Sequence, residues 1–148
     1  MAAKWVNPQG VQTNDDYYEI AVVEYKEKFH SDLAKPTTLR GYIQIDQFAT
    51  NGLTAPTGWV SKALPLYYPN TSGKVVFAAG DTIPVDAKPI MIEGTDANGK
   101  RTGTKVQAIA VDAPHYLGPI IAATSTNPAS VAAGLTGAPT RLKFLNLL

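Results

Sequence analysis

Short runs of alternating or β-branched residues, most of them bounded by Gly, Pro or Asn, follow one another along this chain. Residues 17–25 (YYEIAVVEY) are rich in aromatic and β-branched side chains, which favours a first strand. Residues 39–45 place Leu39, Ile43 and Ile45 on one face, which indicates a second strand. Further short β candidates lie at 75–77, 89–92 and 105–111.

A turn followed by a strand is predicted after residue 113. Pro114 and Pro119 each fix φ and push the preceding residue toward extended geometry, and Gly118 is free of Cβ crowding. The apolar run at 119–124 (PIIAAT) is short and bounded by breakers. It therefore predicts a strand that is buried on both faces.

The last apolar segment, residues 140–147, begins with a strict alternation. Leu142 and Phe144 point to one side of an extended chain, and Arg141 and Lys143 point to the other. An alternation with a period of two residues is typical of a half-buried strand, whose apolar side faces the core. We therefore predict a last strand here.

Three stretches lack a clear pattern. Residues 1–16 are polar and irregular, and we interpret them as an N-terminal arm that packs through Trp5 and Val6. Residues 48–75 are rich in Gly, Pro and aromatic residues, and a loop of this length predicts an insertion that packs on a neighbour or carries function. Asn98-Gly99 is a hairpin signal within a longer loop.

Frequent turns between short strands, with no amphipathic helix, predict an all-β fold, either a β-sandwich or a Greek-key barrel. The composition agrees, because 148 residues suit one domain and 12 Gly with 11 Pro indicate many turns. The pattern alone does not separate a cupredoxin-like arrangement from an immunoglobulin-like sandwich.

The charge balance excludes several classes of partner. A formal net charge of +1 predicts neither nucleic-acid binding nor attachment to an anionic membrane. No apolar run reaches the roughly 20 residues that span a bilayer. Met1–Trp5 is not followed by the apolar core of a signal peptide, so we expect any export signal to lie outside this sequence.

The residues that could carry chemistry are few. The sequence has no cysteine, which excludes disulfides, thiolate ligands and a cysteine nucleophile. His30 and His115 are far apart, and we interpret both as structural. Asp96–Lys100 resembles the start of a calcium loop, but Lys100 takes the place of an oxygen ligand, which favours a hairpin turn. We predict no catalytic, cofactor-binding or metal-binding residue in this chain.

Two segments resemble the multicopper oxidases, in the branch of bilirubin oxidase and the spore-coat laccases. The first is Glu24–Leu33 (EYKEKFHSDL) with Thr38–Tyr42 (TLRGY), and the second is His115–Ile121 (HYLGPII) followed by 141–148 (RLKFLNLL). The resemblance implies the N-terminal part of the first cupredoxin domain. We therefore expect residues 17–148 to form an incomplete cupredoxin-like Greek-key β-sandwich or barrel, with 1–16 as the arm and 48–75 as a loop insertion.

The resemblance also implies a function for the complete protein. Multicopper oxidases couple the one-electron oxidation of a reducing substrate to the reduction of dioxygen to water. A blue-copper site needs two histidines and a cysteine thiolate, so the copper ligands are expected outside this chain, which supplies scaffold and is not competent alone. Its expected partner is the remaining polypeptide of the oxidase or a further subunit. The location implied is extracytoplasmic: periplasmic, cell-surface or secreted.

A second hypothesis is a metal-free β-sandwich for binding or assembly, such as a subunit of a filament or cell surface. It rests on the lack of metal ligands, on the aromatic-rich stretch at 48–75 and on the apolar segment 144–148. This segment carries no turn or polar tail, so we expect it to pack against further polypeptide and the chain to be a fragment.

Overall fold

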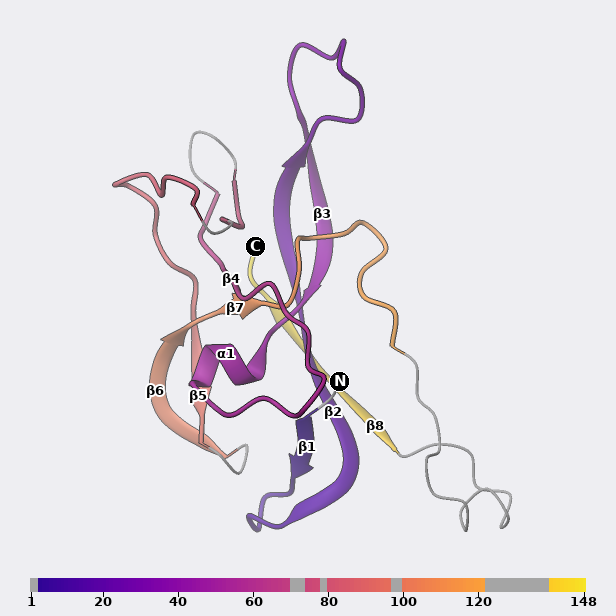
Figure 1. Cartoon of the computed structure of the whole chain (residues 1–148), viewed down its shortest axis with the longest axis vertical. Coiled ribbons are helices and arrows are strands. Elements are labelled where there is room, and N and C mark those ends of the chain that lie inside the picture. The colour runs from indigo at the N-terminus through magenta and orange to yellow at the C-terminus, as the bar shows by residue number, and fades with distance from the viewer. Residues whose placement is uncertain (1–2, 70–73, 78–79, 97–99, 122–138) are drawn as a thin grey trace, which may run out of the picture.

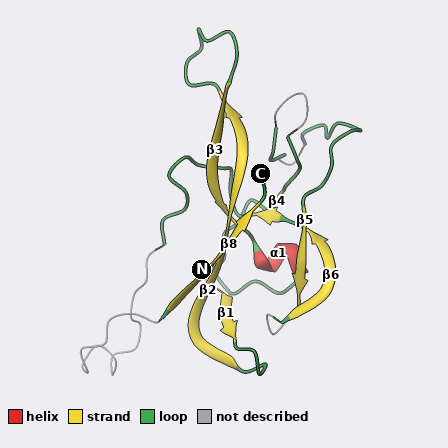
Figure 2. Cartoon of the chain, turned by 180° about the vertical axis from the view of Figure 1, so that it is seen from behind, coloured by secondary structure: helices red, strands yellow, loops and turns green. Residues whose placement is uncertain are grey.

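The computed structural model describes residues 3–69, 74–77, 80–96, 100–121 and 139–148. Within these ranges the chain is all-β with one short helix, which confirms the predicted all-β class (Figure 2). The helix is α1 (Gln47–Asn51). The strands are β1 (Ala3–Val6), β2 (Gln12–Glu27), β3 (Thr37–Gln44), β4 (Leu64–Pro65), β5 (Met91–Thr95), β6 (Arg101–Gln107), β7 (Ile109–Ala110) and β8 (Thr140–Asn146).

The long strand β2 is the centre of the main sheet (Figure 1). Its N-terminal part pairs antiparallel with β1, and residues 20–27 pair antiparallel with β3. Strand β8 runs parallel to β2 along residues 16–22. These residues overlap with those that pair with β1 and with β3, and a strand has only two edges. Strand β8 therefore occupies one edge of β2, and β1 and β3 share the other.

The hydrophobic core lies on one side of this sheet, which we call the inner face. Alternate residues of β2 point into it, and the small sheets β4–β7 and β5–β6 cover it. Burial of these apolar side chains is the main force that holds the layers together. The buried cluster consists of Ala21, Val23, Tyr25, Ile43, Ile45, Leu64, Leu66, Val75, Ile90, Ile92, Ala108 and Ala110.

Strands β2 and β3 continue past the body of the molecule as a projecting hairpin (Figure 1). Its tip, residues 28–36, is exposed throughout. From here on we call this tip, and not the N-terminal residues 1–16, the arm. Two of its apolar side chains face solvent, Phe29 with 62% and Leu33 with 41% of their surface accessible. The arm therefore extends apolar side chains away from the core that would otherwise bury them.

Residues 1–16 and 48–75 contain more regular structure than their sequence pattern predicts. Strand β1 and the start of β2 lie within 1–16, and the Trp5 ring packs on Tyr17 with centroids 5.0 Å apart, as the expected packing through Trp5 requires. The stretch 48–75 contributes Leu64, Leu66 and Val75 to the core. The short apolar alternation of the buried residues was not recognised in the sequence, because aromatic and proline residues interrupt it.

The C-terminal turn is confirmed, but the strand predicted after it is wrong where it can be assessed. Gly118 has a φ of +74°, and a Cβ there would lie 2.9 Å from Cβ of Tyr42. Residues 119–121 form no strand, and 122–124 lie outside the described residues.

Asn98-Gly99 also lies outside the described residues, but β5 and β6 on either side pair antiparallel, as a hairpin requires. In the described part of the chain no helix is long and apolar enough to cross a bilayer.

Candidate functional site

The two histidines lie in separate, exposed settings. His30 is in the arm, where its Nδ1 accepts a hydrogen bond of 3.2 Å from the Asp32 backbone N–H and lies 3.5 Å from Oδ2 of the same residue. His115 pairs through its backbone with Tyr42, at 3.0 and 3.3 Å. Within the described ranges, no group of three or more His, Asp or Glu side chains is arranged to hold a metal ion.

The side of strand β8 that faces solvent is the one that its sequence predicts to face the core. Leu142 and Phe144 face solvent with 46% and 65% of their surface accessible. Lys143 and Leu145 point inward, and Leu145 packs against the core. Leu147 packs there as well, and Glu19, which is only 4% accessible, lies directly beside Lys143 in the parallel register. A buried carboxylate requires a cation, so this pair fixes which side of β8 faces in.

The side of the main sheet remote from the core is therefore partly apolar, and we call it the outer face. The sheet register places Tyr42 of β3 beside Val22 of β2, and Leu142 of β8 beside Tyr18. Tyr42 is 42% accessible. Contiguous apolar surface of this kind marks interaction sites in soluble proteins. The outer face consists of Tyr18, Val22, Tyr42, Leu142 and Phe144, together with Ile20, which is itself only 4% accessible.

The second edge of β8 adds backbone donors and acceptors beside the outer face. Leu147 N–H donates to the Val22 carbonyl, so alternate residues from 141 to 147 bond to β2. The backbone groups of Leu142, Phe144 and Asn146 then point to the other edge, because successive residues of a strand alternate. No strand in the described part of the chain pairs with that edge. Such an edge is a template for a further strand.

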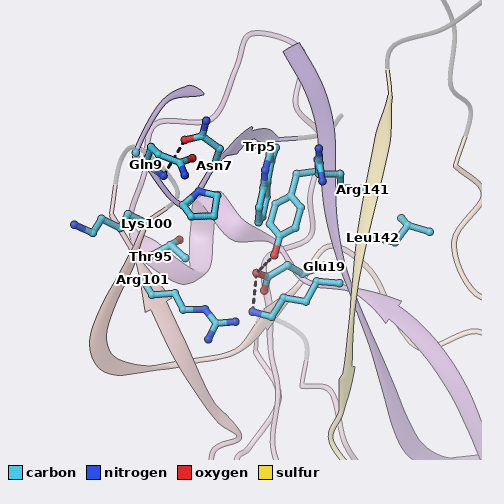
Figure 3. A pocket seen from close by; sticks show the side chains of 13 residues that line it. Trp5, Asn7, Gln9, Glu19, Thr95, Lys100, Arg101, Arg141 and Leu142 are labelled. Carbon is cyan, nitrogen blue, oxygen red and sulfur yellow. Dashed lines mark hydrogen bonds and ion pairs between the residues drawn. The ribbon is translucent and has the colours of Figure 1, made fainter. Parts of the chain in front are cut away.

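A pocket of about 810 Å³ lies on the inner face, beyond the core along β2 (Figure 3). Glu19 forms its floor and accepts hydrogen bonds from the Tyr17 hydroxyl at 2.9 Å and from Nζ of Lys143 at 3.1 Å. Burial and the negative charge of Glu19 together raise the pKa of Tyr17 far above its usual value. Tyr17 therefore stays a neutral donor to the carboxylate at physiological pH.

One wall of the pocket is a stack of aromatic and cationic groups. The Arg141 guanidinium lies over the Trp5 ring, 5.4 Å from its centroid, and its Nε donates to Asp15 at 2.6 Å. Cation–π and ion-pair contacts of this type hold side chains in one orientation. Trp5 and Tyr17 are thus fixed at the mouth of the pocket, between β1 and β8.

The wall opposite comes from the β5–β6 hairpin. Arg101 points toward Glu19, whereas the Lys100 side chain points away from the pocket (Figure 3). The Arg101 guanidinium also pairs with Glu93 at 3.0 Å, although 63% of the Arg101 side chain stays accessible. Besides Arg141 in the aromatic wall, the pocket therefore has Lys143 and Arg101 on opposite sides of one buried carboxylate.

Sequence reasoning missed this pocket, and one signal could have found it. Glu19 alternates with Ala21, Val23 and Tyr25, so it shares their buried face. A carboxylate on an apolar face predicts a buried partner, but the partner lies 124 residues away in β8. Trp5 and Arg101 could not be assigned, since only the fold brings them together.

No family model matches this chain, and no significant match was found among curated proteins or solved structures.

Proposed function

We propose that this chain is a metal-free β module for assembly, and that a second copy of it packs on the outer face and adds a strand to the adjoining free edge of β8. The observation that carries the proposal is the orientation of β8. Leu142 and Phe144 are turned to solvent although the strand could bury them, and the Glu19–Lys143 pair holds them there. Apolar side chains that are fixed in an exposed position gain stability when another surface covers them.

The free edge of β8 supports a β-structured partner. The backbone groups of Leu142, Phe144 and Asn146 point outward beside the same apolar side chains. A strand added here would extend the sheet, and its own side chains would pack beside Leu142 and Phe144.

The charge and the arm favour a second copy as that partner. A net charge of +1 gives little repulsion between copies. The arm carries Phe29 and Leu33 beyond the body, where they can reach a neighbour. Contacts between unlike surfaces of identical chains close into rings or continue as filaments. This arrangement suits the filament or cell-surface role expected from the sequence.

Sedimentation of the purified protein over a range of concentrations tests the proposal. We expect oligomers in the wild type, and we expect the double variant Leu142→Ser, Phe144→Ser to be monomeric with an unchanged circular dichroism spectrum. Val85→Ser removes an even more exposed apolar side chain elsewhere and should leave assembly unchanged. A wild type that stays monomeric at all concentrations, or a double variant that assembles normally, would contradict the proposal.

A second candidate is the N-terminal segment of a multicopper oxidase, in an extracytoplasmic location. One observation favours it: the two segments that carry the resemblance meet in the fold, since Tyr42 of the first pairs with His115 of the second. The donors of this chain, two separated histidines and no cysteine, do not fit a blue-copper site. Copper, dioxygen and the reducing substrate would then be bound by other polypeptide.

Elemental analysis together with the intact mass of the natural protein separates the two candidates. Several copper ions per molecule, in a protein much heavier than 15.8 kDa, would favour the oxidase. A protein near this mass that takes up no copper would exclude the oxidase and leave the assembly module.

A further inference from the structure

The pocket on the inner face plays no part in the proposed assembly, which uses the opposite side of the sheet. Leu142 borders both, but its side chain points away from the pocket (Figure 3). The volume of about 810 Å³ falls in the range of small-molecule sites, roughly 300–1,000 Å³. Its lining comes from β1, β2 and the turn between them, and from β5, β6 and β8, so the fold as a whole fixes its shape.

The polar groups of the pocket favour a negatively charged ligand. An ammonium has three N–H donors and a guanidinium five. Lys143 donates one bond to Glu19, and Arg101 pairs with Glu93 through one nitrogen. Both cations therefore retain donors on the side of the cavity, while Glu19 is the one carboxylate among the lining residues that the structure describes.

The remaining lining gives the pocket an apolar side. Trp5 and Pro8 lie along β1 and the turn after it, and the Trp5 ring is held by Tyr17 and Arg141. An aromatic ring that is fixed in place contributes contact area with little loss of side-chain entropy on binding. The same cavity thus presents charged donors at one end and a flat apolar surface at the other.

We propose that this pocket binds a small organic oxyanion, with its carboxylate or phosphate group held by Arg101 and Lys143 and its ring against Trp5 and Pro8. The charged group accepts hydrogen bonds from the donors of Arg101 and Lys143 that Glu93 and Glu19 leave unused. The ring excludes water from them, which strengthens the charge-assisted hydrogen bonds.

An NMR titration that follows the Trp5 indole N–H tests this site. The probes are phenyl phosphate and benzoate. Phenol, which lacks the charge, and inorganic phosphate, which lacks the ring, are the controls. We expect a saturable shift with at least one ring-bearing anion, weaker binding of inorganic phosphate and no saturable shift with phenol. Binding should weaken as salt is raised, because the contacts are ionic.

The variant Arg101→Gln should raise the dissociation constant about tenfold or more, since a hydrogen bond to a charged group is lost. Lys105→Gln is the matched control, because Lys105 is an exposed cation on the same strand and also lies opposite Glu93. Equal dissociation constants in the two variants would overturn the proposal. So would phenol binding as tightly as phenyl phosphate, or the lack of a saturable shift with both ring-bearing anions.

Discussion

Glu19 is the residue on which the orientation of the sheet depends most. It is 4% accessible, and it is held by Tyr17 from its own strand and by Lys143 from β8. An ionised carboxylate in such a place is stable only if its charge and its lone pairs are satisfied. The pair therefore has two effects: it anchors β8, and it turns Phe144 outward.

Replacing Lys143 by methionine should destabilise the fold by leaving Glu19 without its cation. We expect a loss of about 2 kcal/mol, less than the ~3–5 kcal/mol of a fully buried pair, because the Lys143 side chain keeps 26% of its accessibility. Denaturant unfolding at neutral pH measures the change. Lys105→Met, at an exposed site, should shift the free energy of unfolding by less than about 0.5 kcal/mol. Adding Glu19→Gln to Lys143→Met should restore part of the loss.

Stability should fall at alkaline pH because of Tyr17. Its pKa is raised by burial and by Glu19, and burial and Glu27 likewise raise the pKa of Tyr25. Above pH 10.0, the usual tyrosine pKa, the unfolded chain loses these protons while the native protein keeps them. The stabilising effect is thus complete below that pH and is lost as the pH rises. Tyr17→Phe should flatten the decline, and an unchanged slope would refute this assignment.

At the scale of elements, β2 organises the molecule because it pairs on both edges and is longer than any neighbour. Its strand character could be predicted, since residues 17–25 carry aromatic and β-branched side chains. Its extension to Gln12 could not, because the polar residues 12–16 are held by pairing with β1 and β8 and not by their own propensity. Tertiary contacts decided where this strand begins.

Strand β8 shows even more clearly that tertiary contacts decide features that the local sequence does not reveal. The alternation of 140–147 correctly predicts a strand, but it assigns Leu142 and Phe144 to the core. The sequence does not reveal that Lys143 meets a buried carboxylate on a distant strand, and that meeting reverses the two sides. The outer face and the pocket both follow from this pair, so neither could be predicted from local pattern alone.

The contact between β3 and the turn at His115 requires glycine at position 41. A Cβ on Gly41 would lie 2.6 Å from the His115 carbonyl oxygen and 2.8 Å from Cε1 of Tyr25. We expect Gly41→Ala to reduce the free energy of unfolding by about 1–3 kcal/mol, because a backbone atom must move. Thr38→Ala, at an exposed position of the same strand, should have little effect in the same thermal unfolding experiment. Equal melting temperatures of Gly41→Ala and Thr38→Ala would show that the turn at His115 moves freely.

At the scale of the whole molecule, the two sides of the main sheet have different properties. The inner face holds the core and, beyond it, a polar pocket with paired charges. The outer face is partly apolar and adjoins a strand edge that no described strand covers. We interpret this division as one side for stability and a small ligand, and the other for association with a second copy.

Hydrogen–deuterium exchange of the β8 amides, followed by NMR at low and high protein concentration, tests that association most directly. The amides of Lys143 and Leu145 bond to β2 and should be protected at both concentrations. The amides of Leu142, Phe144 and Asn146 point to the free edge, and they should exchange fast in dilute protein and slowly in concentrated protein. If these three exchange equally fast at every concentration, a second copy does not add to this edge, and the proposed assembly is wrong.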